Sequence, residues 1–396
     1  MVNTDKKTID EILDRGIIVD AIPSLEEFRE KLLSGDKLKF YIGFDPTSTA
    51  LHLGHARNIM VLEEFRKLGH EVIALFGDFT AMVGDPSGKE SARKQLSKEE
   101  VLENVKNWEK HIRPLMDFDN KENPPKIKYN SEWLSKLSFE DVVNLASNFT
   151  VQQMIERDMF QKRIAEKKPV FLNEFLYPLM QGYDGVAMGV DVEMCGTDQI
   201  FNALAGRTLL KKLKNKDKFV VVLGLIANPK TGELMSKSHG TGVFIDSTPS
   251  DMFGAIMSQA DEMTEILLVN NTRISLSKVR DILKEEPMEA KKITAFEIVK
   301  IFYGEGEARV AQTSFENTFQ GRKFFETDTV VKVQKGKELK ECLLLNNYVS
   351  SAAEFRRLVK DGAIDFDGET IDDARYKIEK PGIVRIGKKK FVKLEF

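Results

Sequence analysis

Cysteine is scarce in this sequence. The two cysteines, Cys195 and Cys342, stand far apart in a chain of 396 residues. This spacing excludes both a disulfide framework and a zinc site built on paired cysteines. We therefore expect two reduced, packed thiols and no protein-bound structural metal.

Long apolar runs are also missing. No stretch reaches the length that a membrane-spanning helix requires. Residues 1–16 alternate charged and apolar side chains at helical spacing, instead of forming the apolar centre of a secretory signal. These features predict a cytoplasmic protein without a membrane partner.

The chain carries no large excess of charge of either sign. It has 59 Lys and Arg against 62 Asp and Glu, a formal net charge of -3. Bulk attraction to DNA is therefore not expected, whereas a local basic patch on one domain is still compatible with the sequence. The length exceeds the size at which one core usually keeps growing, which predicts two or three domains.

A strand, a helix and a second strand follow one another between residues 37 and 79. The strands are the apolar stretches 37–44 and 71–79, and the helix between them ends at Gly69, a position typical of a left-handed cap. Such a unit has parallel strands joined by a right-handed crossover. The predicted fold class is α/β, with a Rossmann-like, doubly wound parallel sheet.

The rest of the chain divides by its pattern of apolar and turn residues. Long helical patterns at about 100–180 indicate an insertion within an α/β domain that spans 1–232, and a glycine-rich linker occupies 233–247. The stretch 248–325 is helical throughout and opens on capping residues. Residues 331–396 combine a helix with short alternating strands, which indicates a small α+β domain.

Two histidines stand where the first strand-to-helix connection enters its helix. His52-Leu53-Gly54-His55 falls at a position where backbone N–H groups and the helix dipole favour an anion. The imidazoles can donate to phosphate oxygens, and Gly54 permits close approach of a nucleotide. The alternative is two polar residues in an ordinary first helical turn. The position favours the phosphate site, because open α/β sheets bind ligands at the carboxyl ends of their strands.

A second motif, Leu234-Met235-Ser236-Lys237-Ser238, lies in the glycine-rich linker. A lysine on such a turn can stabilise negative charge that is greatest on a departing pyrophosphate. The alternative is a solvated linker lysine. Together and in this order, the two motifs resemble those of the class I aminoacyl-tRNA synthetases, and the resemblance extends over the whole chain. The family's second motif usually begins with lysine, where this sequence has Leu234, so Lys237 would act with help from Lys89, Arg93 or His239.

Residues 84–91 only superficially suggest a P-loop. That motif needs glycine at Val83 and Ser or Thr at Glu90. In synthetases of this kind the stretch resembles a segment near the amino-acid site, with Asp85 as a carboxylate for the substrate ammonium. The alternative is a plain Asp-Pro-Ser-Gly turn.

The residues that distinguish amino-acid substrates resemble those of bacterial tyrosyl enzymes. Tyr41 would reach the substrate phenol from the opening strand. Tyr177, Gln181 and Asp184 have the spacing i, i+4 and i+7, which places them on one face of a helix. The resemblance assigns the ammonium end to Tyr177 and Gln181, and the phenol to Asp184.

The complete set of implied site residues follows from the same resemblance. Catalysis falls to His52, His55, Lys237 and Thr47. ATP binding falls to Gly54, Asp45, Asp198, Leu234, Met235, Ser236 and Ser238. Tyrosine binding falls to Tyr41, Gly43, Asp85, Tyr177, Gln181, Asp184 and Gln199. No covalent nucleophile is needed, because the substrate carboxylate attacks ATP directly, with Mg2+ on the leaving pyrophosphate.

The C-terminal segment resembles the alpha-L RNA-binding motif of bacterial tyrosyl enzymes. Arg356, Arg357 and Lys360 lie close together on one expected helix and form a candidate tRNA-binding patch, with Lys388, Lys389 and Lys390 as a weaker second group. The alternative is a solvated charged face. The resemblance also implies tRNA-Tyr, L-tyrosine and ATP as partners, a homodimer, and anticodon-stem binding by the helical stretch 248–325.

Three other functions compete with this interpretation. A tryptophanyl enzyme shares the fold, but Tyr41, Asp184 and the C-terminal domain oppose it. A small-molecule nucleotidyltransferase also uses the first motif, but normally lacks the helical and RNA-binding domains. An RNA-binding paralogue without catalysis is opposed by His52, His55 and Lys237.

Overall fold

A computed structural model of the chain describes residues 1–86, 96–235, 242–319, 330–346, 348–387 and 390–396. The chain forms two compact units, Met1–Ala308 and Arg309–Phe396. No described helix combines the length and the apolar character needed to cross a membrane.

A six-stranded sheet is the centre of the first unit, in the order β1-β6-β5-β2-β3-β4. Five of its strands are parallel: β2 (Lys39–Phe44), β3 (Glu71–Phe76), β4 (Lys126–Tyr129), β5 (Val192–Gly196) and β6 (Phe219–Leu223). The predicted parallel sheet is therefore confirmed. The sixth strand, β1 (Ile18–Ile22), pairs antiparallel with β6 at the edge and was not expected from the sequence.

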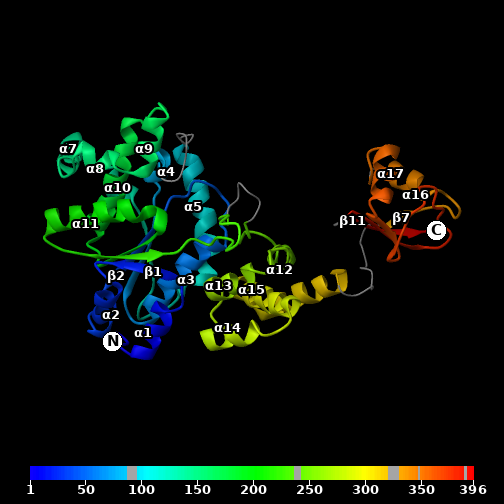
Figure 1. The fold of residues 1–396 in the computed structure, drawn as a ribbon, viewed down its shortest axis with the longest axis horizontal. Helices are drawn as coiled ribbons and strands as arrows, with labels where there is room; N and C mark the ends of the chain where they lie inside the picture. Colours follow the sequence, from blue (N-terminus) through cyan, green and yellow to red (C-terminus); the bar gives the residue numbers. More distant parts are fainter. Residues whose placement is uncertain (87–95, 236–241, 320–329, 347, 388–389) are drawn as a thin grey trace. The chain divides into compact units, whose positions relative to one another are not determined.

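Helices cover both faces of this sheet (Figure 1). Below it in that view lie α1 (Lys6–Leu13), α2 (Leu25–Leu33) and α3 (Leu53–Lys67); above it lie α10 (Leu172–Met188) and α11 (Ile200–Lys214). Because alternate residues of a strand face opposite sides, Phe40 of β2 packs against Phe65 of α3 with ring centroids 4.4 Å apart, whereas Tyr41 belongs to a different apolar cluster. Burial on both faces explains the near-continuous apolar character of β2 and β3.

The connection from β2 to β3 matches the expectation in detail. α3 begins directly after His52, and Gly69 follows its C-terminal cap with φ of +98°. A built Cβ at Gly69 would lie 2.8 Å from the backbone oxygen of Met1, so both the conformation and the space require glycine there.

The stretch expected to be a helical insertion is largely helical but also supplies β4. Its helices are α5 (Lys98–Ile112), α6 (Ser131–Leu134), α7 (Phe139–Ala146), α8 (Val151–Ile155) and α9 (Asp158–Ala165), preceded by the short α4 (Thr80–Val83) and with the 3₁₀ turn η1 (Arg113–Leu115) after α5. The strand was missed because it has only four residues, two of them lysine, as is common at a sheet edge.

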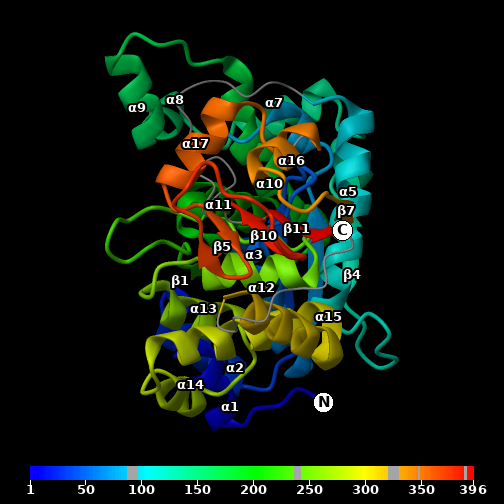
Figure 2. The same cartoon turned by 90° about the vertical axis from the view of Figure 1, so that its right-hand side faces the viewer.

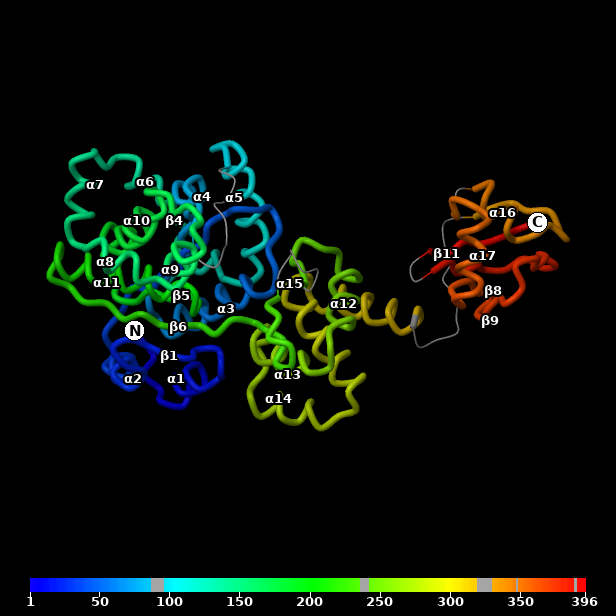
Figure 3. Tube along the Cα trace, turned by 45° about the horizontal axis from the view of Figure 1, so that its top comes forward, coloured from blue at the N-terminus to red at the C-terminus, as the bar shows by residue number. Residues whose placement is uncertain are grey.

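Helices fill the described part of the stretch after residue 248. They are α12 (Pro249–Met257), α13 (Met263–Asn271), α14 (Leu276–Ile282) and α15 (Pro287–Phe319), which breaks at Gly304. Thr248 opens α12 by accepting a hydrogen bond from the backbone N–H of Asp251. Figure 3 shows these helices grouped together.

The second unit is a small α+β structure. Its five-stranded sheet has the order β7-β11-β10-β8-β9, and its strands are β7 (Val330–Lys332), β8 (Ile364–Phe366), β9 (Glu369–Thr370), β10 (Gly382–Ile386) and β11 (Lys390–Glu395). Helices α16 (Leu339–Leu345) and α17 (Ala352–Lys360) pack beside each other on this sheet (Figure 2). Both helices and the sheet share one apolar core, which includes Phe355, Ile364 and Val392.

Candidate active site

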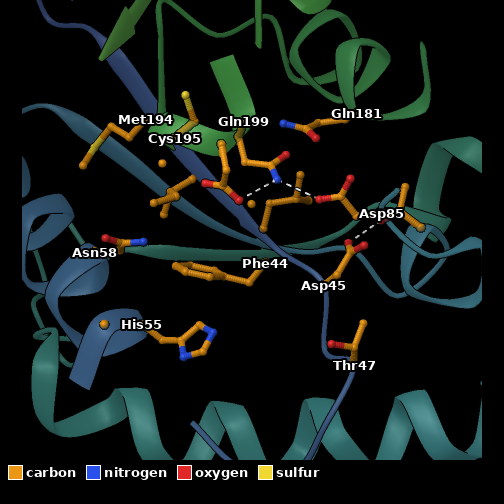
Figure 4. Close-up of a pocket in the computed structure, with 18 of the residues that line it drawn as sticks. Phe44, Asp45, Thr47, His55, Asn58, Asp85, Gln181, Met194, Cys195 and Gln199 are labelled. Carbon is orange, nitrogen blue, oxygen red and sulfur yellow. Dashed lines mark hydrogen bonds between the residues drawn. The ribbon is translucent and has the colours of Figure 1, made fainter. Parts of the chain in front are cut away.

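A cavity of about 400 Å³ opens at the carboxyl ends of β2, β3 and β5. The chain leaves β2 toward β3 on one side, and β5 lies on the other, so the cavity occupies the point where the strand order reverses. Ligands of doubly wound sheets bind at such a point. Figure 4 shows His55 and Thr47 toward one end of the cavity and Gln181 and Gln199 toward the other.

His52 and His55 are held by reciprocal hydrogen bonds at the start of α3. His52 Nδ1 accepts from the backbone N–H of Gly54 at 3.1 Å, and His55 Nδ1 accepts from the backbone N–H of His52 at 3.3 Å. A Cβ at Gly54 would lie 2.8 Å from the His52 ring, so this arrangement itself requires the glycine. Because each Nδ1 accepts, the proton of a neutral ring sits on Nε2, which is left as a donor.

Both histidines are neutral at physiological pH. Burial, and then the charge of Arg57, lower the pKa of His52 to about 4. Burial, and then the adjacent His52, lower the pKa of His55 to about 3. The buried Arg57 forms no ion pair with any described carboxylate; it donates instead to the Gly224 carbonyl and to Asn58 Oδ1. Arg57 is thus a cationic side chain at the wall of the cavity that the sequence analysis missed.

The loop after β2 is fixed by donors from one face of α5. The side chains of Asn104, Asn107 and Trp108 donate to the backbone carbonyls of Pro46, Thr49 and Ser48, at 2.8, 2.6 and 2.7 Å. This places Thr47 and Asp45 at the cavity wall. Asp45 accepts from Thr80 Oγ1 at 2.7 Å and from Tyr177 Oη at 2.8 Å, so its carboxylate links the loop to α10.

Tyr41 and Asp184 line the buried floor of the cavity. Tyr41 Oη makes no hydrogen bond to any described residue. Burial, and then the nearby Glu193, raise the pKa of Tyr41, so its hydroxyl keeps the proton. Burial likewise raises the pKa of Asp184, while hydrogen bonds from Trp133 Nε1 at 2.7 Å and Asn130 Nδ2 at 3.3 Å oppose that shift. A buried, unpaired hydroxyl beside a held carboxylate is suited to recognising a polar group on an otherwise apolar ligand.

The three predicted residues of α10 do share one face. Tyr177, Gln181 and Asp184 all line the cavity. Gln181 Oε1 accepts from Asn202 Nδ2 at 2.9 Å, and Gln181 Nε2 donates to Glu193 Oε1 at 3.3 Å. The helix therefore presents a hydroxyl, an amide and a carboxylate in a row.

The turn after β5 brings two acidic side chains together. In the 3₁₀ turn Thr197–Gln199, Gln199 Nε2 donates to Asp85 Oδ2 at 2.7 Å and to Asp198 Oδ2 at 3.1 Å (Figure 4). A Cβ at Gly196 would lie 2.5 Å from Asp198 Oδ1, so the fold-back of Asp198 requires glycine. Asp85 and Asp198, more than 100 residues apart in the sequence, thus face one cavity.

The second motif is described only at its edges. Ser236, Lys237, Ser238 and His239 lie outside the described residues, as do Lys89 and Arg93. Leu234 and Met235 line the cavity, and Met235 donates its N–H to the Ile226 carbonyl at 2.9 Å. On the other side of the gap, the Val243 carbonyl accepts from the backbone N–H of Leu53 at 3.0 Å. Before the gap, the described chain therefore lies at the cavity wall, and after the gap it lies beside the first motif.

Several cavity residues were absent from the sequence analysis. Thr80, Trp108, Asn130 and Glu193 stand at its wall. Asn130 directly follows β4, so recognition of that strand would have pointed to it. Among the described residues, no cluster of three or more His, Cys, Asp or Glu has the arrangement of a metal site.

The predicted basic residues that the structure describes in the second unit reach solvent. Arg356, Arg357 and Lys360 are exposed on α17, whose buried face carries Phe355 and Val359. Lys388 and Lys389 lie outside the described residues, and Lys390 is exposed at the start of β11.

Comparison with known proteins decides the family. Residues 33–320 match the model of the class I tRNA synthetases for tryptophan and tyrosine. A tyrosine–tRNA ligase of Thermotoga maritima is 38% identical over 391 residues, which cover 97% of this chain and 96% of the relative. This chain belongs to the class I tyrosyl-tRNA synthetases.

Other relatives agree with this family. A tyrosine–tRNA ligase of Aquifex aeolicus is 39% identical over 375 residues, covering 93% of this chain and 94% of that protein. Among solved structures, a truncated mitochondrial tyrosyl-tRNA synthetase of Aspergillus nidulans aligns with a TM-score of 0.69 at 20% identity, over 79% of this chain and 94% of its own. The structural match supports the Rossmann-like fold of the synthetase family.

Proposed function

We propose that this chain activates L-tyrosine with ATP, forming tyrosyl-adenylate and pyrophosphate, and then transfers the tyrosine to the 3′ end of tRNA-Tyr. The observation that carries the choice of amino acid is the floor of the cavity, where the unpaired Tyr41 hydroxyl stands beside the held carboxylate of Asp184. Both groups would bond the substrate phenol. An amino acid without a hydroxyl would leave them unpaired, an effect for which tyrosyl enzymes are themselves the standard illustration.

Binding of the other end of tyrosine falls to the opposite side of the cavity. Asp85, Tyr177 and Gln181 offer a carboxylate, a hydroxyl and an amide oxygen to the substrate ammonium, and Gln199 stands beside them for the substrate carboxylate. When the phenol and the ammonium of tyrosine are both bound, the substrate carboxylate has a single orientation in the cavity. The carboxylate oxygen is then already aligned for in-line attack on the α-phosphorus of ATP, which lowers the entropic cost of the reaction.

Binding of ATP falls to the start of α3 and the turn after β5. The Nε2–H groups of His52 and His55, with Thr47, would donate to phosphate oxygens, and Asp198 would accept from the ribose hydroxyls. Mg2+ enters with ATP as part of the substrate. Gly43 and Gly54 leave the backbone open to the nucleotide and the amino acid.

The first reaction is a displacement at the α-phosphorus of ATP. A tyrosine carboxylate oxygen forms a bond to phosphorus as the bond to the bridging oxygen breaks, and that oxygen leaves with the pyrophosphate. The neutral histidines donate hydrogen bonds without changing protonation, and Lys237 would supply the positive charge as the pyrophosphate departs. In the second reaction, a hydroxyl of the tRNA 3′ ribose forms a bond to the tyrosyl carbonyl carbon as the bond from that carbon to the phosphate oxygen breaks, and AMP leaves with the hydroxyl proton.

Binding of tRNA is proposed for the parts of the chain beyond the cavity. The exposed Arg356, Arg357 and Lys360 of α17 present three positive charges on one short helix, which suits contact with a phosphate backbone. Helices α12 to α15 would receive the anticodon stem. These roles correspond to the proposed domains 248–325 and 331–396, with 1–232 as the catalytic domain and 233–247 as the linker that carries Lys237.

We also propose a cytoplasmic homodimer. Helices α7 and α8 lie together at one side of the first unit (Figures 1 and 3). Large apolar side chains are exposed on these helices and at the start of α10: Phe139 and Val143 of α7, Val151 of α8, and Phe171 and Leu172 of α10 and its cap. Leu172 is 79% exposed and Phe139 is 85% exposed. Such a group supports a self-association surface. Leu172→Asp should convert the protein to a monomer in size-exclusion chromatography with light scattering, and an unchanged dimer would exclude this surface.

Exchange of pyrophosphate into ATP tests the proposed reaction. The full chain should support exchange with tyrosine and not with tryptophan or phenylalanine. Exchange with tryptophan alone would replace the assignment by the tryptophanyl one. Absence of exchange with any amino acid, in a folded protein that binds tRNA, would favour the non-catalytic paralogue.

A further inference from the structure

A buried ion pair lies directly behind the cavity. Lys218 precedes β6, and its side chain is 0% exposed; it pairs with Glu193 of β5, whose side chain is 2% exposed. Removing both charges from water is costly, and apolar residues of similar size would often serve stability as well. A contribution to the stability of the fold is therefore a weak explanation for the presence of this ion pair.

Two glycines make room for the ammonium group. A Cβ at Gly206 of α11 would lie 2.6 Å from Lys218 Nζ, and one at Gly185 of α10 would lie 3.2 Å from it. The same ammonium stands 5.8 Å from the centre of the Tyr41 ring. Lys218 is thus confined between two helices and the floor of the cavity, while its partner Glu193 reaches the cavity wall.

Glu193 connects this cation to the residues of the cavity. One carboxylate oxygen pairs with Lys218, and the other accepts from Gln181 Nε2 at 3.3 Å. Gln181 Oε1 in turn accepts from Asn202 Nδ2 at 2.9 Å, and Asn202 Nδ2 also donates to Gln199 Oε1 at 2.8 Å. A continuous series of hydrogen bonds therefore runs from the buried lysine to two cavity amides.

The charge of Glu193 decides which way the Gln181 amide points. The two ends of an amide have nearly the same shape, so packing alone does not distinguish them. An ionised carboxylate only accepts hydrogen bonds, so Gln181 must turn its NH2 group toward Glu193. Its oxygen then faces Asn202 and the cavity, where it can accept from a substrate ammonium.

We propose that Lys218 is a positioning residue for recognition of the amino group: by pairing with one oxygen of Glu193, it holds the other oxygen as the acceptor of the Gln181 NH2 group, and this fixes the amide oxygen toward the substrate ammonium. This inference rests on the proposed function. Without the ammonium, one oxygen of Glu193 loses its donor, and the carboxylate can turn away from Gln181. The amide could then reverse and place its NH2 group against the ammonium, two donors facing each other.

Glu193→Gln is the sharpest test, because it keeps the shape and leaves Lys218 in place. Lys218 would donate to the new amide oxygen, so the new NH2 group would face Gln181 and force its amide to reverse. We expect the Kd and KM for tyrosine to rise about tenfold, with a smaller change in kcat. The double variant Glu193→Gln with Lys218→Met frees the new amide to turn its oxygen to Gln181, and should recover most of the loss.

Two ligands distinguish a reversed Gln181 amide from general damage to the cavity. Tyramine carries the phenol and the ammonium, and should lose affinity for the single variant as tyrosine does. 3-(4-Hydroxyphenyl)propanoate carries the phenol without an ammonium, and should bind the native protein and both variants equally. Equal weakening of this second ligand, or no recovery in the double variant, would overturn the proposal.

A folding check and a comparison with the native protein distinguish failure of this inference from other causes of weak binding. Thermal melting verifies that each variant folds; should Glu193→Gln fail, Lys218→Met alone carries the test, with the same selective loss expected and an equal loss of both ligands refuting it. If the native protein binds tyrosine and Glu193→Gln binds it with the same affinity, only this inference is refuted. If the native protein neither binds tyrosine nor supports exchange of pyrophosphate into ATP, the proposed function itself is refuted.

Discussion

The two ends of the cavity are built on different principles. At the floor and the adjoining wall, acidic side chains are buried and held by side-chain donors: Asp184 by Trp133 and Asn130, and Glu193 by Lys218 and Gln181. At the start of α3, the functional groups are neutral imidazoles whose Nδ1 atoms are held by backbone N–H groups. In the proposed reaction, the floor binds the amino-acid substrate, and the helix end stabilises charge that develops as the reaction proceeds.

This difference has a physical cause. A rigid set of buried partners gives selectivity, because a wrong ligand leaves them unpaired. In the proposed mechanism, neutral donors at the helix end bind phosphate without a strong charge of their own, and Lys237 would supply the largest positive charge when the pyrophosphate leaves. Variants at the two ends should therefore affect different kinetic constants.

The largest effect is expected at the phosphate end, from Lys237→Ala. Loss of its charge should lower kcat for adenylate formation by about 10²–10³-fold, and change the Kd for tyrosine little, because the charge acts on the departing pyrophosphate. Single-turnover adenylate formation and equilibrium tyrosine binding measure the two quantities. Similar losses in both would contradict the contrast between the two ends.

A smaller effect is expected at the floor, from Tyr41→Phe. The lost hydroxyl should lower kcat/KM for tyrosine about tenfold and improve exchange with phenylalanine, because one group that phenylalanine leaves unpaired is gone. Exchange kinetics with both amino acids give the ratio. Tyr129→Phe is the control, because the Tyr129 hydroxyl is paired with Glu109. This variant should leave the ratio of kcat/KM for tyrosine to that for phenylalanine unchanged. An unchanged ratio in Tyr41→Phe would remove Tyr41 from the specificity site.

Neither end of the cavity should respond to changes on α17. Arg356, Arg357 and Lys360 changed together to Gln should raise the KM for tRNA by about 3–10-fold and weaken its salt dependence, while exchange is unaffected. Aminoacylation at two salt concentrations measures both effects. The matched control changes the exposed Lys332, Lys335 and Lys337 of the same unit to Gln. An equal effect of the control would mean that tRNA responds to total charge and not to the α17 face.

The last effect concerns the pH dependence of stability and not a kinetic constant. His52 and His55 have folded pKa values of about 4 and 3, below the ordinary value of 6.5. Between about pH 6.5 and 4 the unfolded chain binds more protons, so stability falls as the pH falls, by on the order of 2–3 kcal/mol for each histidine in this range. His55→Asn should make the fall shallower in urea unfolding at pH 7.5 and 5. His111→Asn, at a less buried histidine, should change the slope less; identical slopes in His55→Asn and the native protein would rule out the low pKa.

The sequence predicted those parts of the site that depend on local spacing. The repeat of Tyr177, Gln181 and Asp184 fixes one helical face, because 3.6 residues complete a turn. The first motif at the start of α3 was placed correctly, because a strand, a short loop and a helix follow one another without interruption. The parallel β2–β3 pair follows from the same local unit.

Contacts between distant segments had no comparable signal. β1 and β4 are short, and each is stabilised by a neighbour far away in the sequence, so neither was recognised. The donors to Asp184 come from the stretch just after β4, and nothing in the spacing of Asn130 and Trp133 relates them to α10. Their function exists only once the sheet is assembled.

What the sequence determined by itself was the local geometry of the proposed site residues, since helix faces and helix starts depend on neighbouring residues. What only the tertiary structure decided was the charge and orientation of those groups. Burial makes His52 and His55 neutral, and the pairing of Lys218 with Glu193 across two strands sets the direction of the Gln181 amide. Desolvation and hydrogen-bond direction depend on everything that surrounds a side chain, and that environment comes from segments the chain brings together only by folding.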